Sequence, residues 1–167
     1  RQTYTTGKTS SPHISIFGYY RSASSAWSWI AGVAATSVKA LEIDPARPLK
    51  TLRVLGIEAP EPSDRFNSSD RDALLFKGIS TTVYDNAGNV YIELPVTCYL
   101  NAQDSSDDSY LMVNTLYTLF KLRQTFNSLW ARKYPRHKLA DDGGRFRPGQ
   151  AIMTPILAKS ETVALAR

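Results

Sequence analysis

Apolar and polar residues alternate along this chain with a strand period in some segments and a helical period in others. Residues 12–17 alternate, and their isoleucines would share one face of a strand. A second short strand is predicted over 51–57. Two β-branched and aromatic runs flank the sequence DNAGN, which predicts a β-hairpin over 79–100. Pro95 cannot donate a hydrogen bond to a strand ladder, so it predicts an edge or a bulge in the second strand.

A helical period follows the first predicted strand. The segment 22–43 has serines that could cap its start, and Asp44, Pro45 and Pro48 would end it because proline cannot continue a helix. Its many alanines, together with Gly32, would allow a neighbouring element to approach closely. The positions at helical spacing, expected to face the core, are Trp27, Ile30, Ala31, Ala34, Val38 and Leu41.

The longest helix is predicted over about 108–133. Asp107 and Asp108 would lie at its start and Arg132 and Lys133 at its end, an arrangement that suits the helix macrodipole. A broad apolar stripe along it comprises Met112, Val113, Leu116, Leu119, Phe120, Phe126, Leu129 and Trp130.

Two shorter helices complete the pattern. Ser68 or Ser69 could cap a helix that runs through Phe76. Thr154 and Pro155 are typical of an N-cap and a first helical residue, so another helix would begin there. Strands and helices therefore mostly alternate, with one hairpin inserted. We predict an α/β fold with a mixed sheet flanked by helices and an inserted β-hairpin.

The composition is that of a folded domain. The chain has 167 residues, of which 43% are hydrophobic and 21% charged, so disorder of the whole is excluded. Cys98 is the one cysteine and lies in an apolar strand-like run, so we expect a buried small hydrophobe and no intrachain disulfide. No run approaches the ~20 apolar residues of a membrane span. Neither end looks like a natural terminus, and we expect a fragment of a longer polypeptide.

Positive charge is concentrated in one region. The net charge is +5, and eight of the twenty Lys and Arg residues lie between Lys121 and Arg147. Only Asp141 and Asp142 oppose them in that interval. An acidic partner near this region is therefore plausible.

Residues 134–150, YPRHKLADDGGRFRPGQ, have the composition of an active-site loop. His137 with Asp141 and Asp142 could bind a metal or catalyse hydrolysis, although the spacing matches no known metal site or triad. Adjacent aspartates before two glycines are more typical of a turn. The GKT of residues 7–9 lacks the first glycine of a phosphate-binding loop. A small hydrolase and a basic nucleic-acid-binding module stay open as alternatives.

Several segments, in order over nearly the whole chain, resemble the tail sheath protein of contractile-tailed bacteriophages, the Mu-like group in particular. The longest similar segment is KYPRHKLADDGGRFRPGQAIMTP, residues 133–155. The others are SPHISIF (11–17), ALEIDPARPLKTL (40–52), EAPEPSDRF (58–66), LLFKGIST (74–81), DNAGNVYIE (85–93) and SYLMVNTLYTLFKLRQ (109–124).

The resemblance implies a structural protein, not an enzyme, with no nucleotide, metal or other cofactor. Sheath subunits of this family stack as hexameric rings around a tail tube, and their contraction drives the tube through the host envelope. The implied partners are other sheath subunits, the tube protein, the baseplate and the tail terminator, with no membrane and no nucleic acid. The implied location is the tail sheath of the virion, assembled in the cytoplasm of the host bacterium.

Family members are considerably longer than this chain. Residues 1–134 would then form part of the sheath core domain, and 135–167 the basic loop and the start of the C-terminal sheath segment. The loop cations would contact acidic groups on the tube or on an adjacent subunit, because charge attraction tolerates sliding. Internal pairing with Asp141, Asp142 or Glu161 is the alternative. The candidate partner-contact residues are Arg136, His137, Lys138, Asp141, Asp142, Arg145 and Arg147.

Overall fold

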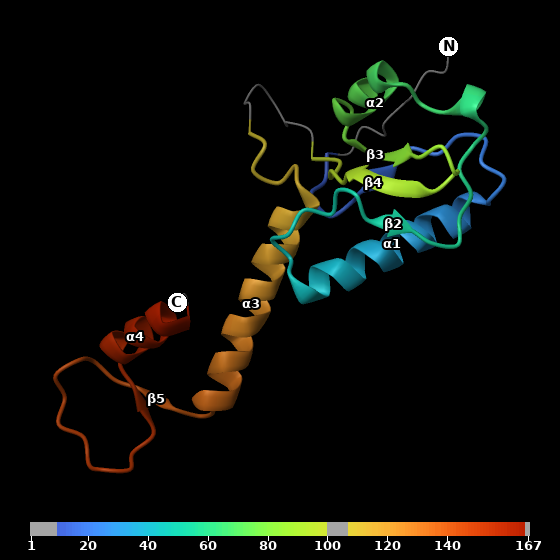
Figure 1. Ribbon diagram of the computed structural model, residues 1–167. Coiled ribbons are helices and arrows are strands. Elements are labelled where there is room, and N and C mark those ends of the chain that lie inside the picture. The colour runs from blue at the N-terminus through green and yellow to red at the C-terminus, as the bar shows by residue number, and fades with distance from the viewer. Residues whose placement is uncertain (1–9, 100–106, 166–167) are drawn as a thin grey trace. The chain divides into compact units, whose positions relative to one another are not determined.

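The computed structural model describes residues 10–99 and 107–165 (Figure 1). The chain divides into two compact units, Arg1–Thr118 and Leu119–Arg167. The GKT of residues 7–9 lies outside the described residues. The functional division expected after residue 134 stays a prediction, because a division by internal contacts does not show where the C-terminal sheath segment begins.

The first unit is built on a four-stranded mixed sheet in the order β1-β3-β4-β2. β1 (Ile16–Phe17) runs parallel to β3 (Ile79–Tyr84), which pairs antiparallel with β4 (Val90–Leu94). β2 (Arg53–Val54) is antiparallel to β4. The predicted α/β class, mixed sheet and hairpin are confirmed, although the first two strands have two residues each and are shorter than the predicted ranges 12–17 and 51–57.

The hairpin turn is held by the polar residues of DNAGN. The Asp85 carboxylate accepts hydrogen bonds from the Asn89 backbone N–H at 2.7 Å and from its side-chain amide at 2.6 Å. These bonds lower the pKa of Asp85. Gly88 has a φ of +78°, which favours glycine. The register between β3 and β4 shifts where Thr81 and Thr82 pair with Leu94 and Ile92, so the pairing is irregular directly before Pro95.

One face of the sheet is covered by α1 (Ala26–Ile43), which Ser25 caps (Figure 1). The predicted buried face is wrong except at Leu41. The helix carries two apolar rows, and the one that packs on the sheet follows i, i+4 spacing, while Trp27 is 82% exposed. The predicted close approach does occur at Gly32, where a Cβ would lie 3.1 Å from Val54 Cγ1. The buried row is Trp29, Val33, Ser37 and Leu41.

The opposite face of the sheet is covered by α2 (Ser68–Leu75), which follows a short 3-10 turn, η1 (Pro62–Asp64) (Figure 1). Asn67 caps α2, in place of the two predicted serines. Its side chain accepts from the Asp70 N–H at 2.8 Å, and the Asp70 carboxylate accepts from the Asn67 N–H at 3.2 Å. This reciprocal capping box places the N-cap at Asn67, one residue before Ser68 and two before Ser69.

The long helix α3 (Val113–Lys133) begins later than predicted. Asp107 does not lie in its first turn; its carboxylate accepts from Ser109 and, at 3.0 Å, from the Tyr99 hydroxyl. Those bonds lower the pKa of Asp107. No described residue of α3 is buried, so the predicted apolar stripe does not form a core. Within the first unit, Asn114 Nδ2 donates to the Arg47 carbonyl at 2.7 Å and anchors the start of α3.

The second unit contains the rest of α3, two short parallel strands and α4 (Pro155–Leu165). β5 (Lys138–Leu139) pairs with β6 (Ile152–Met153). The predicted cap is confirmed, because the Thr154 hydroxyl accepts from the Leu157 N–H at 3.4 Å.

In the first unit Cys98 is buried, as predicted, and burial raises its pKa. None of the described helices is long and apolar enough to cross a bilayer.

Candidate partner-contact site

The basic loop begins where an aromatic row ends α3. Phe126, Trp130 and Tyr134 follow one another at helical spacing, with ring centroids 5.7 Å and 5.4 Å apart. The His137 ring continues the row, edge-on to Tyr134 with centroids 5.1 Å apart. Its Nδ1 lies 3.2 Å from the Pro135 carbonyl oxygen. His137 therefore packs as an aromatic residue at the helix exit.

One carboxylate links the two helices of this unit. Lys133 Nζ lies 2.6 Å from Glu161 Oε1, and the Tyr134 hydroxyl donates to the same oxygen at 2.6 Å. The bond to Lys133, followed by that to Tyr134, lowers the pKa of Glu161. The same carboxylate raises the pKa of both Lys133 and Tyr134. The Glu161 carboxylate therefore binds Lys133 and Tyr134 and does not pair with the loop cations.

The strand pair closes the base of the loop. Lys138 N–H donates to the Ala151 carbonyl at 2.8 Å, and Ala140 N–H to the Met153 carbonyl at 3.0 Å. Asp142 Oδ1 accepts from the Ile156 N–H at 3.1 Å, so this carboxylate adds to the cap of α4. Asp142 and Gly143 form the turn that their residue types predict, with Gly143 at a φ of +84°.

The four loop cations face solvent. Arg136, Lys138, Arg145 and Arg147 are all exposed, and none forms an ion pair with a carboxylate of the described residues. The internal pairing considered as the alternative is therefore absent from the described part of the chain. Arg136 has a φ of +59°, so a turn places its side chain at the cost of backbone strain.

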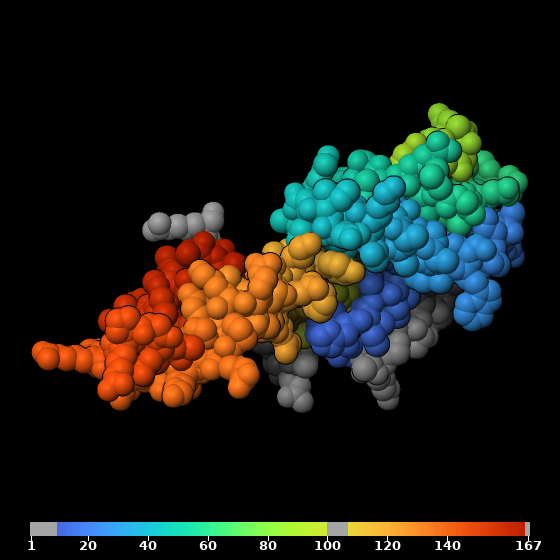
Figure 2. Space-filling view, turned by 90° about the horizontal axis from the view of Figure 1, so that it is seen from below, coloured from blue at the N-terminus to red at the C-terminus, as the bar shows by residue number. Residues whose placement is uncertain are grey.

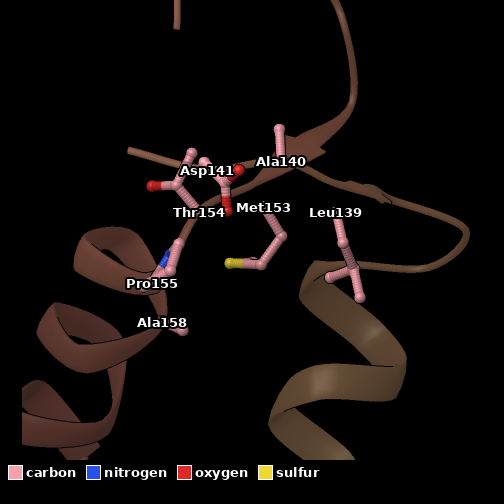
Figure 3. Close-up of a pocket in the computed structure, with 7 residues that line it drawn as sticks. All are labelled: Leu139, Ala140, Asp141, Met153, Thr154, Pro155 and Ala158. Atoms are coloured by element: carbon pink, nitrogen blue, oxygen red, sulfur yellow. The ribbon is translucent and has the colours of Figure 1, made fainter. Parts of the chain in front are cut away.

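A surface cavity of about 400 Å³ lies beside the loop (Figure 3). Its walls come from β5, β6 and the first turn of α4, with the Met153 side chain pointing between Leu139 and Pro155 in Figure 3. Asp141 and Thr154 are its polar side chains, and His137 does not line it. The lining residues include no histidine, serine or cysteine.

Metal binding needs several ligating side chains that lie close together. Among the described residues, no group of three or more His, Cys, Asp or Glu side chains converges closely enough to hold a metal ion. The loop thus brings together exposed cations, turn residues and an aromatic helix end. Exposed apolar neighbours that the charge pattern did not reveal are Leu139, Phe146 and Ile156. Partner contact through the seven candidate residues stays a prediction.

Comparison with known proteins gives two matches. Residues 3–98 match the family described as "Phage tail sheath protein central domain". The chain is also 40% identical over 153 residues to the "Mu-like prophage FluMu tail sheath protein" of Haemophilus influenzae. That similarity covers 91% of this chain and 31% of the relative, so the chain spans about a third of the relative's length.

Proposed function

The chain belongs to the phage tail sheath protein family, and from this premise we propose that it is part of a structural subunit of a contractile tail sheath. The complete subunit polymerises around a tail tube and drives contraction during genome delivery. The observation that carries this proposal is the 40% identity over 91% of the chain. The family is a structural one, so the proposal includes no catalytic step and no cofactor.

The partners of the complete subunit follow from the same proposal. Tail sheath membership implies assembly with other sheath subunits. Contacts with the tube protein, the baseplate and a tail terminator, and assembly in the host cytoplasm, belong to the proposal. Electron microscopy of the complete gene product tests it: rings or hollow rods are expected, and a dispersed monomer at high concentration would overturn it.

The basic loop is proposed as one of the contact surfaces. Four exposed cations without an internal carboxylate partner among the described residues can bind acidic groups on the tube or on an adjacent subunit. Each exposed pair would contribute only about 0–1 kcal/mol. Repetition over many subunits makes the sum large enough to matter, and ions at a surface can exchange partners while surfaces slide.

Charge reversal tests the loop directly. The double variant Arg136→Glu with Lys138→Glu, made in the complete gene product, is expected to reduce the yield of tube-bound sheath at least tenfold. Lys159→Glu is the matched control, because Lys159 is an exposed cation on α4 outside the loop. Normal tails from the double variant would remove the loop from the contact surface without affecting the wider proposal.

The nucleic-acid-binding alternative receives no support from the family match or the relative. It makes a distinct prediction, since phosphate contacts cause affinity to fall steeply with salt. A salt-sensitive gel shift of duplex DNA by the complete gene product would favour it over the sheath proposal.

A further inference from the structure

A groove of about 620 Å³ lies in the first unit between α1 and the segment that follows it, residues 48–55. Its walls include Gly32, Ala40 and Leu52, and two large apolar side chains, Ile43 and Leu55, stand at it with 81% and 69% of their surface exposed. In Figure 2 the residues of α1, coloured from blue to cyan, lie at the surface of the unit. Nothing in the described part of the unit covers these apolar groups.

The groove is strongly basic. Four cations line it, against the single carboxylate of Asp44. Asp44 Oδ1 accepts from the Ala46 N–H at 3.1 Å, and Arg53 Nη2 donates to Asn89 Oδ1. None of the four cations pairs with a carboxylate of the described residues. They are Lys39, Arg47, Lys50 and Arg53.

An acidic loop lies at the other end of the same helix. Glu58 is fixed there by its backbone: its N–H donates to Ser24 Oγ at 2.8 Å, and its carbonyl accepts from Ser22 Oγ at 2.6 Å. Ser24 directly precedes the Ser25 cap of α1, and Ser22 lies three residues before it. The side chains of Glu58 and Glu61 are exposed and have no ion-pair partner among the described residues.

The backbone of this loop is prepared for binding. Pro60 and Pro62 flank Glu61, whose φ of −54° and ψ of 147° are those of an extended chain. Proline lowers the conformational entropy that ordering would remove, so docking costs less than for a flexible loop. Pro62 is exposed and offers apolar surface beside the carboxylates.

Within one copy, neither Glu58 nor Glu61 pairs with a groove cation among the described residues. α1 has 18 residues and is about 27 Å long, and the groove extends along it from Gly32 to the C-cap residue Asp44. The hydrogen bonds to Ser22 and Ser24 hold the backbone of Glu58 beside the N-terminus of α1. The complementary charges, unpaired with one another within a copy, can therefore meet between copies.

We propose that the acidic loop around Glu58 and Glu61 of one copy docks into the basic groove of the next copy. The contact joins two different surfaces, so it is heterologous and propagates head to tail into a closed ring or an open helix. It rests on the proposed function and adds to it the surfaces by which subunits of this family member would meet. Exposed ion pairs are individually weak, so the contact is salt-sensitive and depends on repetition.

Charge exchange between copies tests the pairing. The groove variant carries Lys39→Glu and Lys50→Glu, and the loop variant carries Glu58→Lys and Glu61→Lys, both in the complete gene product. Each variant alone is expected to lose at least tenfold in assembled material by sedimentation. An equimolar mixture is expected to recover assembly, because the loop of each variant is complementary to the groove of the other. Asp72→Lys and Lys159→Glu are the controls, since both residues are exposed and lie outside the two surfaces.

Cross-linking separates this proposal from the proposed function. A Lys50→Cys, Glu61→Cys double variant, oxidised with copper phenanthroline, is expected to give a ladder of covalent oligomers. Cys98 is buried and serves as the unmodified background. Rods that form normally in both charge variants, with no ladder, would overturn the head-to-tail contact and leave the sheath function standing. A ladder without rods would support the contact and count against the sheath function.

Discussion

Different kinds of contact stabilise the interior of each of the two units of this chain. In the first, α1 and α2 bury apolar side chains on opposite faces of the sheet, in two clusters centred on Val90 with Ile92 and on Leu74. In the second, Met153 is the one buried apolar side chain among the described residues, and polar links through Glu161 and Asp142 connect its elements. The first unit thus contains a core of its own, whereas the described elements of the second are connected mainly by polar contacts.

Replacing one leucine by alanine in each unit should give the largest difference in stability between the two units. Leu41 is 1% exposed and Leu139 is 87% exposed. Leu41→Ala is expected to cost about 2–5 kcal/mol, because it removes transfer energy and leaves a cavity. Leu139→Ala should change stability by no more than about 0.5 kcal/mol. Urea unfolding of the complete gene product measures both, and equal losses would show that Leu139 is buried in the assembled molecule.

Backbone strain in the loop offers a second test. Arg136 has a φ of +59°, a region that glycine reaches without penalty. Arg136→Gly is expected to stabilise the loop by about 1 kcal/mol, seen as slower amide exchange across β5 and β6. Lys138→Gly is the control: it lies in β5 with no such strain and should destabilise by about 0.5–1 kcal/mol. Faster exchange in Arg136→Gly would mean that its side chain, not its backbone, stabilises the turn.

The smallest expected effect is on the link between α3 and α4. Glu161 has a lowered pKa, so its contribution is present above its unfolded pKa and is lost as the pH falls through the folded value. Lys133 has a raised pKa, so its contribution is present below its unfolded pKa and is lost as the pH rises through the folded value. The protection factors of the amides in α4, which correct for the intrinsic pH dependence of exchange, should therefore be highest between these limits. Glu161→Gln should remove the acid limb, and an unchanged acid limb would assign it to another carboxylate.

Local chemistry predicted the features that depend on a few neighbouring residues. The DNAGN turn, the end of α1 before Pro45 and the Thr154 cap all rest on backbone preferences of the residues themselves. Asn67 was missed in favour of the serines that follow it. The signal was available, since Asn67 and Asp70 have the spacing of a capping box.

Features that depend on distant contacts could not be predicted in the same way. α1 carries two apolar rows, and helical period alone does not tell which one meets the sheet. α3 starts late because Asp107 bonds to Tyr99 and Ser109 instead of to the helix. The loop cations lack these carboxylates as partners because Glu161 binds Lys133 and Asp142 binds the Ile156 N–H. The spacing of these residues in the sequence does not determine those partners.

Cryo-electron microscopy of the particles formed by the complete gene product tests the central claim most directly. The account predicts a hollow rod or stacked rings whose wall repeats the first unit, with a sheet between α1 and α2 in every subunit. Uniform monomers at high concentration that turn over a substrate would contradict it.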